Sequence, residues 1–143
     1  WLQCQQQRFA EATQAFDRAL QTPQYQGAGR TWMLRGVCQA RAGQMQAAEQ
    51  SLMRAFEIEP GNPITLYNLA AMLHQRGNSE RARFYLRRLN NSEAANAESL
   101  WLGVKIENRL QNRDVAQQLG RQLQRRFPDS RQANAYERGA FDE

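Results

Sequence analysis

Hydrophobic residues recur with the period of an α-helix along almost the whole chain of 143 residues. Between residues 8 and 21, for example, Phe9, Ala12, Phe16 and Leu20 follow one another at three- or four-residue spacings, which places them on one helical face. No segment alternates with period two over the length of a strand. The pattern predicts an all-α chain with helices at residues 8–21, 30–42, 45–58, 63–76, 79–90, 95–111 and 114–127, the end of a helix at residues 1–6, and a short final helix at about residues 129–138.

The pattern also repeats every 34 residues. Shifting residues 29–62 forward by one period places Gly43 on Gly77, Ala48 on Ala82 and Leu52 on Leu86. A period of this length is typical of an α-solenoid, in which helical hairpins stack on their neighbours. We therefore expect a single domain over residues 1–143, with a partial repeat at 1–28, repeats at 29–62, 63–96 and 97–128, and a capping helix at 129–138.

Residues suited to tight turns lie between the predicted helices. Gly43 and Gly77 come where the first helix of a pair must end, and a left-handed backbone conformation there would reverse the chain. Pro63 fits the first position of a helix, and Asn62 before it can accept hydrogen bonds from the exposed amides. The longest interruption is at residues 22–29.

With this period, the chain resembles the tetratricopeptide repeat family. Residues 29–62 match the family's order of large, small and turn residues at Trp32, Gly36, Gly43, Ala48, Leu52, Ala55 and Pro60. The next unit matches at Leu66, Leu69, Ala70, Gly77, Ala82, Leu86 and Leu89. The flanking units are more divergent, because Gly120 replaces a bulky residue and Gly103 lies one position early. The resemblance implies a concave surface, lined by the first helix of each pair, that binds another polypeptide.

Segments outside the generic repeat are similar to the type IV pilus biogenesis lipoproteins, the pilotin family called PilF or PilW. They include residues 1–4 (Trp-Leu-Gln-Cys), 36–38 (Gly-Val-Cys), 100–106 (Leu-Trp-Leu-Gly-Val-Lys-Ile) and 123–128. The resemblance implies a non-enzymatic scaffold on the periplasmic face of the outer membrane of a Gram-negative bacterium, with its lipid anchor upstream of this fragment. It also implies a protein partner, the pilus secretin subunit or another pilus assembly protein, and a role in the membrane localisation and multimerisation of the secretin.

The positions that point into the groove in the tetratricopeptide family give the candidate binding surface. They are Arg30, Met33, Val37, Arg41, Ile64, Tyr67, His74, Trp101, Lys105 and Arg109. Apolar and aromatic residues with basic residues at the edges suit an amphipathic or extended peptide that has acidic groups, with Tyr67 and Trp101 as the main anchors. The alternative interpretation is that several of these side chains only pack between helices.

Cys4 and Cys38 are the two cysteines of the chain. In repeat register they lie on neighbouring first helices that run in the same direction, and facing positions there can come close enough for a disulfide. Free buried thiols fit the spacing equally well. The periplasmic location that the resemblance implies favours the disulfide.

The net charge of +5 comes mainly from the C-terminal half, in Arg81, Arg83, Arg87, Arg88, Arg121, Arg125 and Arg126. Solvated helix faces are the simplest interpretation and an acidic protein partner is the next. Nucleic acid is not expected, because few aromatic residues accompany the arginines. His74 is the single histidine and has no metal-ligand cluster or nucleophile in register, so we expect no metal, cofactor or catalytic site. No run of 18 apolar residues is present, and no transmembrane helix is expected.

Two other functions stay open. A cytosolic adaptor of the chaperone-docking kind would clamp a C-terminal carboxylate with Lys and Asn side chains. The corresponding positions hold Met33, Val37 and Leu102, and only Asn68 fits. The chain could also be the regulatory arm of a larger enzyme, which the upstream sequence would reveal.

Overall fold

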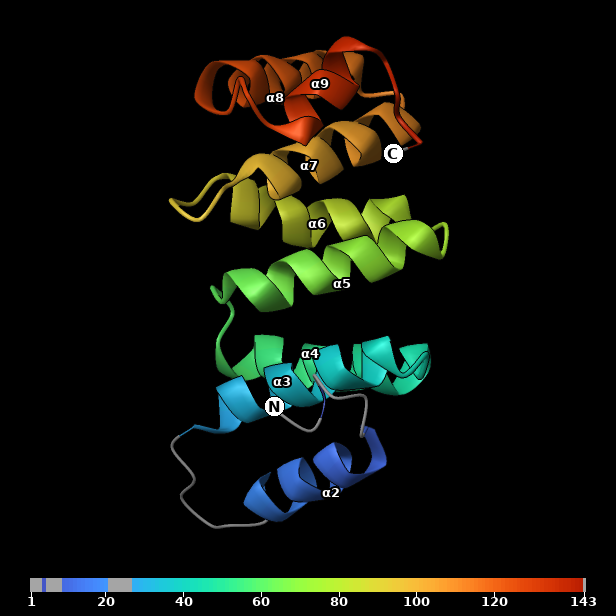
Figure 1. The fold of residues 1–143 in the computed structure, drawn as a ribbon, viewed down its shortest axis with the longest axis vertical. Coiled ribbons are helices and arrows are strands. Elements are labelled where there is room, and N and C mark those ends of the chain that lie inside the picture. Colours follow the sequence, from blue (N-terminus) through green and yellow to red (C-terminus); the bar gives the residue numbers. More distant parts are fainter. Residues whose placement is uncertain (1–3, 5–8, 21–26, 143) are drawn as a thin grey trace. The chain divides into compact units, whose positions relative to one another are not determined.

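A computed structural model describes residue 4, residues 9–20 and residues 27–142, which form helices joined by turns (Figure 1). The described residues contain no strand, so the all-α prediction is confirmed. The helices are α2 (Phe9–Leu20), α3 (Ala28–Arg41), α4 (Met45–Ile58), α5 (Pro63–Gln75), α6 (Ser79–Asn90), α7 (Ala97–Arg109), α8 (Arg113–Arg126) and α9 (Arg131–Glu137). Their bounds agree with the predicted ones to within two residues. The predictions for residues 1–3, 5–8 and 21–26 lie outside the described residues.

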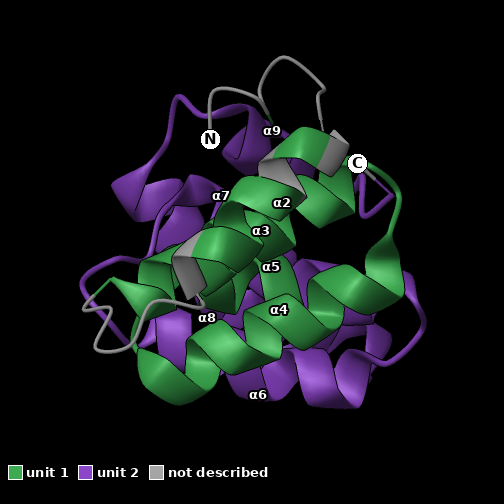
Figure 2. Ribbon diagram, turned by 90° about the horizontal axis from the view of Figure 1, so that it is seen from below, with its two compact units in different colours: residues 1–69 green, residues 70–143 purple. Residues whose placement is uncertain are grey.

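The chain divides into two compact units, residues 1–69 and residues 70–143 (Figure 2). In the first unit, α3 packs on α2 and α4, whereas in the second unit α7 packs on α6, α8 and α9. Each unit therefore contains a first helix that packs on the second helix before it and on the second helix after it, as the hairpin repeat predicts. The single domain over residues 1–143 stays a prediction. None of the described helices combines the length and the apolar content needed to cross a bilayer.

Two glycines reverse the chain inside the hairpins. Gly43, between α3 and α4, has a φ angle of 81°, and Gly77, between α5 and α6, has a φ angle of 83°. An L-amino acid side chain is unfavourable in this left-handed region and glycine is not. The predicted turns are therefore confirmed. One period after Gly77 the same conformation is found at Gln111, whose φ angle is 62°.

The start of α5 is fixed by the residues that the sequence predicts. The side-chain oxygen of Asn62 accepts hydrogen bonds from the backbone N–H groups of Ile64, at 2.9 Å, and Thr65, at 3.3 Å. Pro63 is the first residue of the helix, where its missing N–H is not needed. These contacts satisfy amides that have no partner inside the helix.

Gly36 of α3 lies so close to α4 that a larger residue does not fit. A Cβ atom at this position would be 2.6 Å from Cγ of Leu52 and 3.2 Å from the carbonyl oxygen of Ala48. Leu52 and Ala48 are themselves fully buried. The small residue of the repeat therefore allows the two helices to cross at short distance.

Gly120 of α8 makes a comparable contact with the C-terminal helix. A side chain at Gly120 would overlap the ring of Tyr136, which α9 places against α8. Ser130 holds the start of α9, because its hydroxyl accepts a hydrogen bond from the backbone N–H of Ala133 at 3.0 Å. The aromatic ring thus supplies the volume that the repeat pattern assigns to a bulky residue at position 120.

Cys4 and Cys38 are joined by a disulfide in the first unit, with their α-carbons 5.5 Å apart. Both cysteines are buried in a small cluster with Phe16 of α2. Nearby, the guanidinium Nε of Arg35 lies 2.8 Å from a carboxylate oxygen of Asp17, which ties α3 to α2. Of the two interpretations left open by the spacing, the structure has the disulfide.

Candidate protein-binding surface

On α3, the predicted surface residues form one stripe, but only its ends are exposed. Met33 and Val37 are only 3% and 9% exposed and belong to the core of the first unit. Arg30 and Arg41, at the two ends of the stripe, are exposed. The interpretation that some of these residues pack between helices therefore holds for Met33 and Val37, and α3 offers a partner mainly its guanidinium groups.

The first turns of α5 contribute the apolar part of the surface. Ile64 is 49% exposed, and Tyr67, three residues later on the same helical face, is half-buried. An aromatic ring beside an exposed aliphatic side chain offers contact area with a polar end, which suits a protein anchor. Asn68 is used within the helix, since its amide donates to the carbonyl oxygen of Ile64 at 2.8 Å.

In the second unit, His74, Lys105 and Arg109 form what we call the basic cluster. Lys105 and Arg109 lie four residues apart on one face of α7, and Arg109 is exposed. Burial, followed by the charges of Arg109 and Lys105, lowers the pKa of His74 below 6.5. Burial also lowers the pKa of Lys105. The three side chains are therefore close enough to act on one another, and a carboxylate that enters the cluster would be stabilised by two positive charges.

The ring of His74 is also held by a hydrogen bond. Its Nδ1 atom lies 2.9 Å from the hydroxyl oxygen of Ser79, at the start of α6. Ser79 is buried, which fixes the orientation of the imidazole. The contact therefore occupies Nδ1 of the ring.

Trp101 is buried, although the sequence predicts it as an exposed anchor for a partner. It is only 4% exposed, its ring is stacked on Phe141 with centroids 5.8 Å apart, and Tyr136 meets it edge-on at 6.4 Å. The ammonium group of Lys105 lies 5.5 Å from the centre of the indole ring. Trp101 therefore supports Lys105 through a cation–π contact and does not itself offer surface to a partner.

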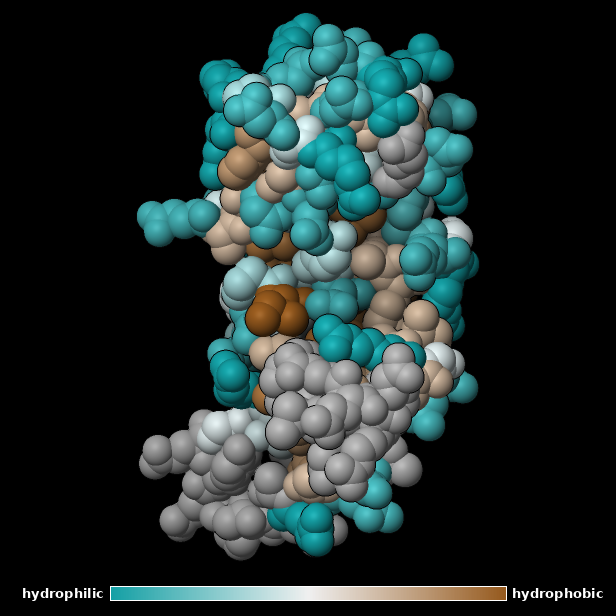
Figure 3. All heavy atoms as spheres, in the orientation of Figure 1, coloured by the Kyte–Doolittle hydropathy of each residue, from teal (hydrophilic) through white to brown (hydrophobic). Residues whose placement is uncertain are grey.

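On the face that Figure 3 shows, the exposed apolar area of the described residues is dispersed. In the face shown in Figure 3, hydrophilic side chains predominate and hydrophobic ones form small separate areas. The most exposed large hydrophobic residues are Met45, Ile58, Ile64, Phe84 and Phe141. A partner would therefore meet a mixed surface, in which charge contributes more to recognition than one continuous apolar patch.

One feature of the second unit is missing from the sequence predictions. A cavity of about 320 Å³ lies between α6, α7 and α8, away from the predicted surface residues. Glu107 and Arg87 both line this cavity, and the buried carboxylate of Glu107 pairs with Arg87. The sequence does contain a sign of this cavity. Gly103 and Glu107, four residues apart on α7, stand where the preceding repeat has Leu69 and Leu73. Within the described part of the chain, no group of three or more His, Cys, Asp or Glu side chains could hold a metal ion.

Comparison with known sequences shows similarity to a repeat family and to one protein of type IV pilus assembly. The model of the tetratricopeptide repeat family matches residues 2–104. The type IV pilus assembly protein PilF of Pseudomonas aeruginosa is 25% identical over 126 residues, which are 88% of this chain and 50% of that protein. The chain thus spans about half the length of this curated relative.

Similar solved structures include type IV pilus proteins and another tetratricopeptide repeat protein. The crystal structure of PilW, a widely conserved type IV pilus biogenesis factor, has a TM-score of 0.83 and 31% identity and matches 95% of this chain and 63% of PilW. The structure of Pseudomonas aeruginosa PilF has a TM-score of 0.84 at 23% identity and matches 96% of this chain and 62% of PilF. A tetratricopeptide repeat protein from Parabacteroides merdae, at 21% identity, has a TM-score of 0.84 over 98% of this chain and 57% of that protein. The last two show the fold alone. The similarity to PilF and PilW that the sequence segments indicate is confirmed.

Proposed function

Because this chain belongs to the tetratricopeptide repeat family, we propose that it is a non-enzymatic protein-binding scaffold of type IV pilus biogenesis. Its relatives support this role, since PilF is a type IV pilus assembly protein and PilW is a type IV pilus biogenesis factor. The proposed task is to assist the outer-membrane localisation and multimerisation of the pilus secretin. The proposed place is the periplasmic face of the outer membrane of a Gram-negative bacterium, with a lipid anchor upstream of these residues.

The observation that carries the proposal is the basic cluster on the first-helix face of the second unit. Lys105 and Arg109 occupy positions that face the bound polypeptide in the repeat family, and His74 lies within their electrostatic range. In the first unit, Ile64 and Tyr67 offer an apolar contact on the same kind of helix. An acidic group of a secretin segment would suit the basic cluster, and an apolar or aromatic side chain would suit Ile64 and Tyr67.

The proposal is tested by titrating the intact protein with purified secretin and measuring affinity by calorimetry. We expect Lys105→Gln combined with Arg109→Gln to weaken binding about tenfold or more, because the partner's carboxylate loses both cations. The matched control is Arg121→Gln combined with Arg125→Gln, which removes the same charge from exposed positions of α8. We expect the control to change affinity by less than about twofold.

Two outcomes would contradict the proposal in different ways. Unchanged affinity in the Lys105 and Arg109 variant would exclude the basic cluster as the secretin site. No binding of secretin by the intact protein would instead favour an adaptor for another polypeptide. Tyr67→Ala tests the apolar contact of the first unit by itself, with an expected loss of affinity of about threefold to tenfold.

A further inference from the structure

The cavity of the second unit lies on the side of the molecule formed by the second helices of the hairpins. It is lined by residues of α6 and α8, and α7 forms its floor. We infer that this cavity is a second docking site, which receives the apolar side chains of an acidic amphipathic helix from a partner protein. The site is separate from the basic cluster, because none of the three basic-cluster residues lines it.

Apolar side chains line part of the cavity, and the residues that α7 contributes to its floor are Gly103, Ile106 and Glu107. Ile106 and Leu86 are buried side chains of the floor and the wall, and Val115 and Leu119 of α8 are half-buried opposite them. A Cβ atom at Gly103 would be 2.8 Å from Nδ2 of Asn90 and 3.0 Å from Cδ1 of Leu119, so a side chain there would displace these neighbours. Glycine therefore lets α6 and α8 pack closely on α7 at the floor of the cavity. A volume of about 320 Å³ can receive more than one aliphatic side chain.

The helices on either side of the cavity are basic. α6 and α8 together have eight arginines and only two acidic residues, Glu80 and Asp114. Of these arginines, Arg83 and Arg87 line the cavity and form what we call its basic rim. Apolar lining residues between two basic helices are complementary to a helix whose leucine-type side chains are surrounded by carboxylates.

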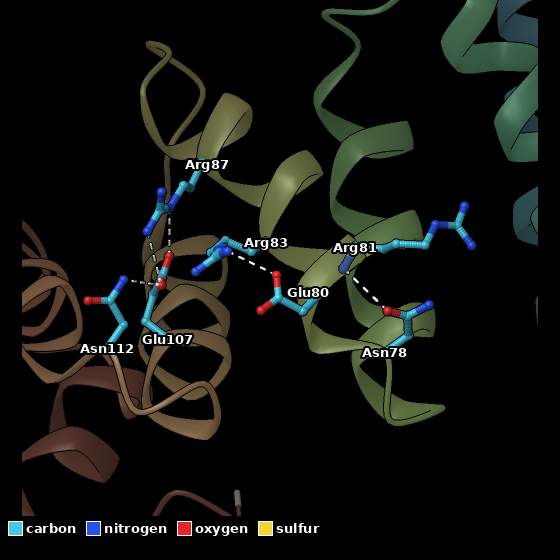
Figure 4. Close-up of polar contacts among 7 residues, drawn as sticks. All are labelled: Asn78, Glu80, Arg81, Arg83, Arg87, Glu107 and Asn112. Carbon is cyan, nitrogen blue, oxygen red and sulfur yellow. Dashed lines mark hydrogen bonds and ion pairs between the residues drawn. The ribbon is translucent and has the colours of Figure 1, made fainter.

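A buried ion pair holds one of these arginines at the edge (Figure 4). The carboxylate of Glu107 is 2% exposed and accepts hydrogen bonds from Arg87, at 2.9 and 3.2 Å, and from the amide of Asn112, at 3.1 Å. Its charge is thereby neutralised inside the unit, while the side chain of Arg87 stays 46% exposed. With Glu107 counted as well, the arginines of the two helices still outnumber the acidic residues around the cavity.

Arg83 has its own fixed position. Its guanidinium lies 2.9 Å from a carboxylate oxygen of Glu80, one turn earlier on α6 (Figure 4). Glu80 is exposed on the surface, so an acidic partner would compete for Arg83 with a solvated pair of small free energy. The basic rim is therefore available to carboxylates at little cost.

The size of the site favours a helix of about three turns as its occupant. α6 has 12 residues and α8 has 14, so each is about 18–21 Å long. Both are second helices of their hairpins, and a docked helix of about three turns would match them in length. Leucines at positions i, i+3, i+4 and i+7 would face the floor, and glutamates on either side would reach the rim.

The test uses the intact chain and a fluorescein-labelled helical peptide of about 14 residues, with leucines at i, i+3, i+4 and i+7 and glutamates at flanking positions. Binding is followed by fluorescence anisotropy. Gln118 is an exposed residue that lines the cavity, and Gln124 is an exposed residue of the same helix that does not. We expect Gln118→Glu to weaken peptide binding about fivefold and Gln118→Lys to strengthen it about threefold, whereas Gln124→Glu changes it by less than about 1.5-fold.

Three outcomes would overturn the inference: no binding of the glutamate peptide, equal binding of a peptide with lysines in place of the glutamates, or equal effects of Gln118→Glu and Gln124→Glu. Tighter binding of single-stranded DNA than of the peptide would show a non-specific polyanion surface and would also overturn it. The Lys105→Gln and Arg109→Gln variant should keep the peptide affinity within about twofold. This result separates the docking site from the secretin-binding proposal, because either one can fail without the other.

Discussion

At the scale of single residues, Gln111 has the backbone conformation that glycine has in the two preceding hairpin turns. Its φ angle of 62° costs an L-amino acid about 1 kcal/mol relative to glycine. We expect Gln111→Gly to raise the free energy of unfolding by about 0.5–1 kcal/mol in urea denaturation. Gln117→Gly, at an exposed position inside α8, should lower it by about 1 kcal/mol. Equal losses in the two variants would contradict the assignment of strain to Gln111.

His74 makes a second prediction at this scale, because it is the single histidine and its NMR signals are unambiguous. Burial, Arg109 and Lys105 lower its pKa in the folded state, so the unfolded state binds a proton first as the pH falls below 6.5. The stability that depends on the neutral ring is therefore complete above pH 6.5 and is lost as the pH falls through the folded pKa. We expect an NMR titration to give a pKa below 6.5.

Two variants test whether the neighbouring charges and the ring itself cause the effects predicted for His74. Lys105→Gln should move the pKa of His74 upward, because one of the two charges that lower it is removed. His74→Gln should reduce the decrease in melting temperature between pH 7.5 and pH 5.5 at constant ionic strength. A pKa above 6.5, or the same pH dependence in His74→Gln, would contradict the described environment of the ring.

At the scale of helices, local residues determine most of what the sequence predicts. Gly43 and Gly77 end a first helix because their conformation is unfavourable for other residues, and Asn62 with Pro63 begins the next one. These are contacts within a few residues, which periodicity and turn chemistry can identify. The turn at Gln111 was not identifiable in this way, since the stacking of α7 and α8 imposes it on a residue that does not favour it.

Contacts between distant segments account for the rest. Gly120 departs from the repeat because the ring of Tyr136 fills its space, and Trp101 is buried because Phe141 stacks on it. Tyr136 and Phe141 do not belong to the repeat pattern. The register of the repeat alone therefore predicts a bulky residue at position 120 and an exposed anchor at Trp101. Register does predict that Lys105 and Arg109 share one face of α7, because that follows from their four-residue spacing. The charged part of the candidate surface was therefore predictable, as were Ile64 and Tyr67, whereas the burial of Met33, Val37 and Trp101 was not.

At the scale of the whole molecule, the two compact units differ in how they are stabilised. The disulfide lies in the first unit and closes a loop with a sequence separation of 34 residues, whereas residues 70–143 contain no cysteine. Such a link stabilises by about 3–4 kcal/mol on the chain-entropy model. In a repeat protein, stability is a sum of contributions from each repeat and from the contacts between neighbouring repeats. The stability lost when the disulfide is reduced therefore need not be shared equally along the chain.

We therefore expect reduction to lower the hydrogen-exchange protection of α2 and α3 by up to about 3 kcal/mol and to leave that of α7 and α8 within about 0.5 kcal/mol. The state of the cysteines is checked by mass, which should rise by two hydrogens on reduction. A Cys4→Ser and Cys38→Ser variant is the control, because added reductant should not change its exchange further. Equal losses in α2, α3, α7 and α8 would instead mean that the two units unfold together, as a single cooperative domain over residues 1–143 requires.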